Sequence, residues 1–146
     1  TYTRRFGGDR VTESDVLHVP PGDPTATIVA DLADAAHLPS SAFDTIILTQ
    51  TLQLIYDVDA AVATLHRILR PGGVLLATCP GATQTYDGDW GAVWCWSFTP
   101  VSARRLFAET FGAEQVTVWS HGNVLAATAF LHGLAKEELS DAELDY

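Results

Sequence analysis

One segment constrains the fold of this chain more than any other. It has a helical pattern of apolar residues, followed by Pro-Gly-Gly and then by a continuous apolar run. Apolar residues recur at spacings of three and four over Val58–Leu69, which predicts one amphipathic helix. Asp57 or Asp59 can accept hydrogen bonds from the free amides of its first turn. Pro71–Gly73 is expected to end the helix, because proline cannot continue it and glycine can take a positive φ.

Short apolar runs separated by turn residues predict the strands. They are Val11–Val19, Thr27–Ala30, Phe43–Thr49, Gly73–Thr78 and Gln115–Trp119. Two further helical patterns follow, Ser102–Phe111 and Asn123–Leu134. Strands that alternate with helices indicate βαβ units. We therefore expect a single α/β domain over residues 1–146, with a Rossmann-like, mostly parallel sheet and helices on both of its faces.

Composition and charge exclude several classes of protein. Hydrophobic residues make up 47% and charged residues 18% of the chain, as in a globular domain. The net charge of −10 argues against a nucleic-acid-binding protein, and no apolar run is long enough to predict a membrane span. Cys79 and Cys95 lack the spacing of a metal site or a disulfide framework, and the histidines form no ligand cluster. We expect a cytoplasmic protein without a metal.

Polar residues follow the predicted strands at the edge where ligands of open α/β sheets bind. They are Asp15 and His18 after the first strand, Asp31 after the second, Thr49, Gln50 and Gln53 after the third, and Cys79 to Gly81 after the fourth. A carboxylate at a strand end can accept both hydroxyls of a ribose, and a second can accept from the amine of a base. By spacing alone, Asp15 and Asp31 can equally be residues that cap loops or helix starts.

Several stretches in a fixed order resemble the motifs of class I S-adenosylmethionine-dependent methyltransferases. Ala30-Asp31-Leu32, His37-Leu38-Pro39 and Ala42 to Ile47 follow the pattern "AD…LP…FD-x-apolar" of that family. Leu65 to Leu76 follows its signature "L-x-R-hydrophobic-L-K/R-P-G-G-x-L". These pieces span roughly half of the chain, and their order and spacing are more specific than any one of them.

The resemblance implies S-adenosylmethionine as the cofactor and assigns residues to it. Asp31 matches the acid near the adenine amino group, and Leu32 matches the neighbour whose amide and side chain flank the adenine. Asp15 is the match to the ribose-binding acid. Thr49 and Gln50 match the region that faces the methionine part and the substrate. We expect the carboxylates of Asp15 and Asp31 to share one crevice beside Gln50.

For the acceptor, the resemblance implies a small molecule or a glycan-linked group. Gln53 and His121 are candidates for its binding, as are Trp90 and Trp94 in the aromatic loop, because such rings stack on sugars. The neighbouring rings of Trp96 and Phe98 are expected in the core. No catalytic residue is assigned, since in-line methyl transfer needs orientation of donor and acceptor more than acid–base help.

One motif of the family has no counterpart in the sequence. Phe6-Gly7-Gly8-Asp9 contains glycines, but no apolar strand precedes them, so the first strand and its glycine-rich turn are expected to be missing from a partial domain. Three explanations stay open: a fragment of a longer enzyme, which the absence of methionine at Thr1 favours, a relative that no longer binds cofactor, or a strand supplied by another chain. The last predicts a homo-oligomer formed through exposed sheet edges.

Two other functions remain as alternatives. A non-catalytic module could keep the α/β scaffold for oligomerisation or for holding a partner enzyme. A domain that binds NAD or a nucleotide sugar is the other, but no glycine-rich fingerprint supports it.

Overall fold

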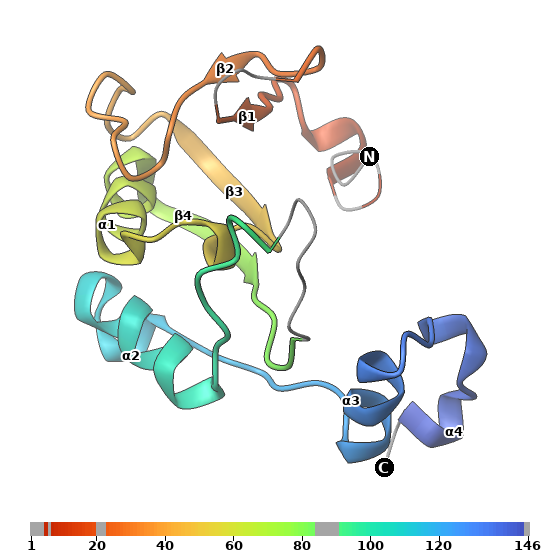
Figure 1. Ribbon diagram of the computed structural model, residues 1–146. Coiled ribbons are helices and arrows are strands. Elements are labelled where there is room, and N and C mark those ends of the chain that lie inside the picture. Colours follow the sequence, from red (N-terminus) through yellow and green to blue (C-terminus); the bar gives the residue numbers. More distant parts are fainter. Residues whose placement is uncertain (1–4, 6, 20–22, 84–90, 145–146) are drawn as a thin grey trace.

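The computed structural model describes residues 5, 7–19, 23–83 and 91–144. Its elements are η2 (Gly8–Arg10), β1 (Leu17–His18), β2 (Ile28–Val29), β3 (Phe43–Thr49), η3 (Leu52–Leu54), α1 (Val58–Ile68), β4 (Leu69–Thr78), α2 (Pro100–Phe111), η4 (Ala113–Gln115), α3 (Val124–Leu131), η5 (Lys136–Glu138) and α4 (Asp141–Leu144) (Figure 1). β1, β2 and β3 follow one another, and α1, β4 and α2 then alternate, which confirms the predicted α/β class.

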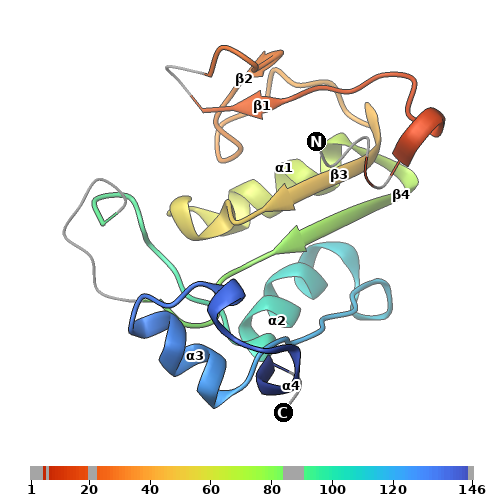
Figure 2. The same ribbon diagram turned by 90° about the vertical axis from the view of Figure 1, so that its right-hand side faces the viewer.

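The strands form two separate parallel pairs. β1 pairs with β2, and β3 pairs with β4. Figure 2 shows β1, β3 and β4 pointing in the same direction. Leu17 of β1 and Ile46 of β3 pack against both clusters of buried residues, so side chains connect the two pairs. The predicted incompleteness of the sheet is confirmed, and the first predicted strand shrinks to Leu17–His18.

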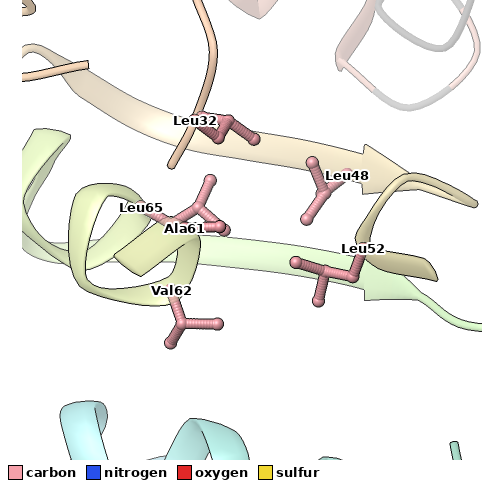
Figure 3. Packing of buried hydrophobic residues seen from close by; sticks show 6 residues of the cluster. All are labelled: Leu32, Leu48, Leu52, Ala61, Val62 and Leu65. Carbon is pink, nitrogen blue, oxygen red and sulfur yellow. The ribbon is translucent and has the colours of Figure 1, made fainter. Parts of the chain in front are cut away.

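The core lies between α1 and the carboxyl half of β3. Asp57 caps α1, because its side chain accepts a hydrogen bond of 3.0 Å from the amide of Ala60. The apolar stripe of α1 then buries Val62 and Leu65, which pack with Leu52 of η3. Figure 3 shows these side chains together with those of Leu32, Leu48 and Ala61. The helix predicted from spacing is therefore the centre of the hydrophobic core.

An arginine near the end of α1 fixes the turn that follows β2. The Arg67 guanidinium donates to the carbonyl oxygen of Leu38, and through Nη2 to the carbonyl oxygen of Ala35 at 2.7 Å. Two donors of one planar group thus hold two carbonyls of the same turn. The segment after β2 is attached to α1 by these bonds as well as by apolar packing.

The Pro-Gly-Gly segment forms a bulge in β4 instead of ending the helix, which corrects the prediction. α1 already ends at Ile68, and β4 begins at Leu69. Phe43 pairs with Leu69 and Thr45 with Val74, so one residue of β3 faces four of β4. Gly72 has a φ of +79°. The loop is closed by an exposed ion pair of 2.6 Å between Arg70 and Asp44.

Helix α2 covers the same face of β3 and β4 as α1 does. Thr99 and Ser102 cap its start in a capping box, and its Phe107 and Phe111 pack against the core cluster. Figures 1 and 2 show α1 and α2 together on one side of the strands. The opposite face exposes Ile47 (37%), Val74 (52%) and Leu76 (51%). The prediction of helices on both faces therefore fails for β3 and β4 within the described ranges.

The segment after α2 was predicted as a strand over Gln115–Trp119, and this prediction is wrong. η4 ends at Gln115, and Val116 to Ser120 is extended without a strand partner in the described part of the chain. A wide groove separates this segment from β4, so no neighbouring edge is available for a ladder. α3 follows, capped by Asn123, whose Nδ2 also donates to the carbonyl of Glu143 at 2.7 Å. In the described ranges no helix is long and apolar enough to span a bilayer.

Candidate functional site

A groove of about 1660 Å³ runs along β4, between this strand and the segment that follows α2. Its polar residues at the carboxyl ends of β3 and β4 are Thr49, Gln50 and Thr78, and His121 lines it from the segment that follows α2. Parallel strands bring their carboxyl ends to one edge, which is where ligands bind in open α/β sheets. The groove thus joins three residues expected from the sequence, Thr49, Gln50 and His121. Thr78 was missed, although its position as the last residue of β4 was the signal.

Gln50 takes a backbone conformation that residues other than glycine rarely adopt. Its φ is +49°, and its amide donates to the carbonyl of Thr78 at 3.0 Å and to Oγ1 of Thr78 at 3.2 Å. A left-handed conformation costs a residue with a Cβ roughly 1–2 kcal/mol. Such strain is concentrated at functional sites, where the surrounding structure maintains it. Ser41, which also lines the groove, has a φ of +51°, so it is the position of Gln50 at the carboxyl ends of the strands, together with its φ, that marks it as a candidate for ligand binding.

Asp31 lies where the sequence placed it, just after the carboxyl end of β2. Its carboxylate is exposed, and Oδ1 accepts a hydrogen bond of 2.9 Å from the amide of Ala33. The second oxygen has no hydrogen bond within the described ranges and can accept one from a ligand. The local turn therefore fixes the carboxylate without using all of its accepting capacity.

Leu32 corrects part of the expectation for its neighbour. Its side chain is only 6% exposed and belongs to the cluster around α1 (Figure 3). It therefore cannot flank an adenine, because α1 and β3 already cover it. The backbone amide of Leu32 remains as the group that the resemblance assigned.

Asp15 does not share a crevice with Asp31, and this expectation is wrong. β1 begins at Leu17, so Asp15 precedes the strand instead of following it. Its Oδ1 accepts a hydrogen bond of 2.8 Å from Oγ1 of Thr27, just before β2 begins. Asp15 and Asp31 therefore lie at opposite ends of the β1–β2 pair, and Asp15 acts as a local hydrogen-bond partner.

The aromatic segment docks on Gln53 and leaves two polar atoms unpaired. The carbonyl of Gln53 accepts hydrogen bonds from the amides of Cys95 (2.7 Å) and Trp96 (3.2 Å). Gln53 itself is 2% exposed. Its Oε1 and the Nε1 of Trp94 are buried without a partner in the part of the chain that the structure describes. Neither residue lines the groove, so the structure does not join them to Gln50.

The other rings divide between the surface and the core. Phe98 packs against the core cluster as expected. Trp96, in contrast, is 37% exposed, and its ring stacks on Tyr56, so the expectation of a core position is wrong for Trp96. Trp90 lies outside the described residues.

Among the described residues, five ionisable side chains line the groove: His66, Arg67, Arg70, Cys79 and His121. Cys79 lines it and is partly buried, and burial raises the pKa of its thiol. His121 is exposed at its edge. Over the described ranges, no group of three or more His, Cys, Asp or Glu side chains could hold a metal ion. The arrangement therefore suits binding and orientation more than acid–base or metal chemistry.

Part of the sequence and the fold as a whole resemble those of known proteins. Residues 9–77 match the model of a family described as methyltransferase domain. The fold is similar to the crystal structure of an S-adenosylmethionine-dependent methyltransferase from Mesorhizobium loti, with a TM-score of 0.55 and 17% sequence identity. That alignment covers 90% of this chain and 76% of the other. No curated protein gives a significant sequence match.

Proposed function

We propose that this chain transfers a methyl group from S-adenosylmethionine to a small-molecule or glycan-linked acceptor. The proposal is supported by the match of residues 9–77 to the methyltransferase domain family and by the similar fold of an S-adenosylmethionine-dependent methyltransferase. The observation that carries the proposal is the groove, in which the strained Gln50 lies beside Thr49 at the carboxyl ends of β3 and β4, and which His121 also lines. The free cysteines Cys79 and Cys95 support a reducing, cytoplasmic location.

The residues of this edge fit the polar parts of S-adenosylmethionine only partly. An exposed carboxylate at Asp31 suits hydrogen bonds donated by the adenine amine or a ribose hydroxyl. The groove exceeds the roughly 300–1000 Å³ of ordinary ligand pockets, so its volume does not exclude the cofactor together with an acceptor. Asp15, however, is engaged with Thr27 at the other end of its strand pair.

Each residue then has a role in orientation. When bound, the cofactor supplies an electrophilic methyl group. We assign Thr49 and the Gln50 side chain, which line the groove, to the amino-acid part, and Asp31 and the amide of Leu32, which lie outside the groove lining, to the nucleoside. His121, on the far wall of the groove, is assigned to the acceptor. Gln53 and Trp94 belong to the acceptor side only if the groove extends toward their buried, unpaired polar atoms.

Calorimetric titration with S-adenosylmethionine tests this proposal. We expect saturable binding, weakened roughly tenfold by Asp31→Asn, because a hydrogen bond to a charged acceptor is worth about 1.5–3 kcal/mol. Gln50→Gly should also weaken binding while preserving the fold, since glycine adopts a positive φ without strain. Asp9→Asn, an exposed acid in η2, is the matched control and should bind like the parent. Absence of binding to both the cofactor and its demethylated product would contradict the proposal.

A second candidate function has its own observation. Ile47, Val74 and Leu76, which line the groove, are exposed on one face of β3 and β4, with Ile47 paired to Leu76 in the strand register. Such a face supports a non-catalytic scaffold that associates with another protein surface. A chain that fails to bind cofactor but self-associates through these residues would favour the scaffold.

A further inference from the structure

A small pocket of about 290 Å³ opens at the start of α1, apart from the groove. Five residues line it: Tyr56, Asp57, Val58, Asp59 and Trp96. None of them lines the groove beside β4. Its volume lies near the lower limit of ligand pockets, roughly 300 Å³, so it fits a single headgroup or side chain.

Two aromatic rings form one wall of this pocket in a fixed arrangement. The centroids of Tyr56 and Trp96 are 5.8 Å apart, with 31° between the ring planes. The indole Nε1 of Trp96 donates to the carbonyl of Ile55 at 2.9 Å and to that of Tyr56 at 3.2 Å. These bonds hold the indole ring in place, while the Tyr56 side remains 79% exposed. The pocket is thus preformed and offers aromatic surface to solvent.

Negative charge beside these rings is not balanced by a cation. Asp57 uses Oδ1 to cap the amide of Ala60, and its other oxygen has no partner within the described ranges. Asp59 is exposed and makes no ion pair there. The ion pair that the described residues do contain, Arg70 with Asp44, lies beyond the other end of α1.

We propose that this pocket binds an organic cation, either an alkylammonium or a guanidinium headgroup. The face of an aromatic ring carries negative charge density and attracts such cations, and quaternary ammonium groups are bound in this way. A neighbouring carboxylate adds Coulomb attraction and pairs with guanidinium in a planar geometry. Anions are excluded by Asp57 and Asp59, because the positive end of α1 is already compensated by these carboxylates.

The proposal does not depend on methyl transfer, so binding is tested without S-adenosylmethionine. Tetramethylammonium chloride and acetyl-arginine amide are titrated into the labelled chain, with sodium chloride at equal ionic strength as the reference. The nitrogen–proton resonance of the Trp96 indole, assigned by its loss in Trp96→Phe, is followed by NMR. We expect a saturable shift with at least one of the organic cations and none beyond the salt reference with sodium. The tighter of the two identifies the headgroup class.

Variants separate the ring and charge contributions. Tyr56→Leu and Asp59→Asn should each weaken binding about twofold to fivefold, the effect of one cation–π contact at an exposed site. Tyr56→Phe should bind like the parent, because the ring and not the hydroxyl attracts the cation. Trp119→Leu, which changes another exposed ring, is the control and should leave binding unaltered. Equal shifts with sodium, or affinities unchanged in both Tyr56→Leu and Asp59→Asn, would overturn the proposal.

Discussion

The two cysteines differ in their surroundings, and at the scale of single residues this predicts different reactivity. Cys95 is exposed, whereas Cys79 is partly buried beside the groove, and burial raises the pKa of its thiol. Only the thiolate attacks an alkylating reagent, so a raised pKa leaves less of the reactive form at neutral pH. We expect iodoacetamide to modify Cys95 first, and the rate at Cys79 to keep rising at more alkaline pH.

Mass spectrometry of the two cysteine peptides over a pH series measures these rates. Cys95→Ser should leave the rate at Cys79 unchanged, which excludes exchange between the thiols. Faster modification of Cys79 at neutral pH would show that its thiol is not held in the buried environment described above.

The positions of the candidate site residues could be predicted only where they depend on nothing but the end of a strand. Thr49 and Gln50 follow a continuous apolar run, so their place at the sheet edge was evident from the sequence. Asp15 was misplaced because the run Val11–Val19 forms a strand only at Leu17–His18, after the acid. The side chain of Leu32, though not its amide, was placed wrongly, because it completes the cluster around α1 through contacts between segments far apart in sequence. The roles of these residues toward a cofactor stay predictions.

At the scale of elements, the bulge in β4 depends on close backbone approach at Gly73. A Cβ at this position would lie 2.9 Å from the carbonyl oxygens of Arg70 and Asp44. Backbone atoms cannot move aside as flexible side chains can, so Gly73→Ala should destabilise the fold by about 1–3 kcal/mol. Urea unfolding followed by circular dichroism measures this difference.

Gly81→Ala is the matched control for this measurement. A Cβ at Gly81 would meet nothing nearer than the carbonyl oxygen of Phe98, at 3.6 Å, which is an ordinary contact. Its stability should stay within about 0.5 kcal/mol of the parent. Similar losses in both variants would indicate that the approach at Gly73 is not the cause.

Elements with a strong local pattern were predicted best. β3 has the predicted bounds, α1 ends one residue before the predicted Leu69, and α2 begins two residues before the predicted Ser102. The segment after α2 failed as a strand because an apolar run becomes a strand only where a neighbouring edge supplies hydrogen bonds. Pro71–Gly73 was predicted to end the helix. The helix ends earlier, because Leu69 of β4 pairs with Phe43 of β3 instead of continuing the helical turn.

At the scale of the whole molecule, the open face of β3 and β4 predicts self-association. Ile47, Val74 and Leu76 are exposed on strands whose other face is buried, and they also form a wall of the groove, so association here would compete with a ligand. Burial of a Leu side chain is worth about 1.5–3 kcal/mol, and about 1.4 kcal/mol is a tenfold change in affinity. The double substitution Val74→Thr and Leu76→Thr should therefore weaken self-association tenfold or more, as measured by sedimentation equilibrium.

Threonine suits a strand, so the double variant should keep its fold. Val124→Thr, on the exposed start of α3, is the comparison and should associate like the parent. A parent chain that sediments as a monomer at every concentration tested would rule out association through this face.

The hydrogen bonds of Arg67 to the carbonyls of Ala35 and Leu38 have a consequence for substitutions in this domain. They link the main helix of the interior to the stretch of chain that begins at Asp31. That stretch is thereby held by a partly buried guanidinium that also lines the groove. Replacing Arg67 would therefore loosen the chain that follows the acid as well as the end of α1, so that ligand affinity and stability would fall together.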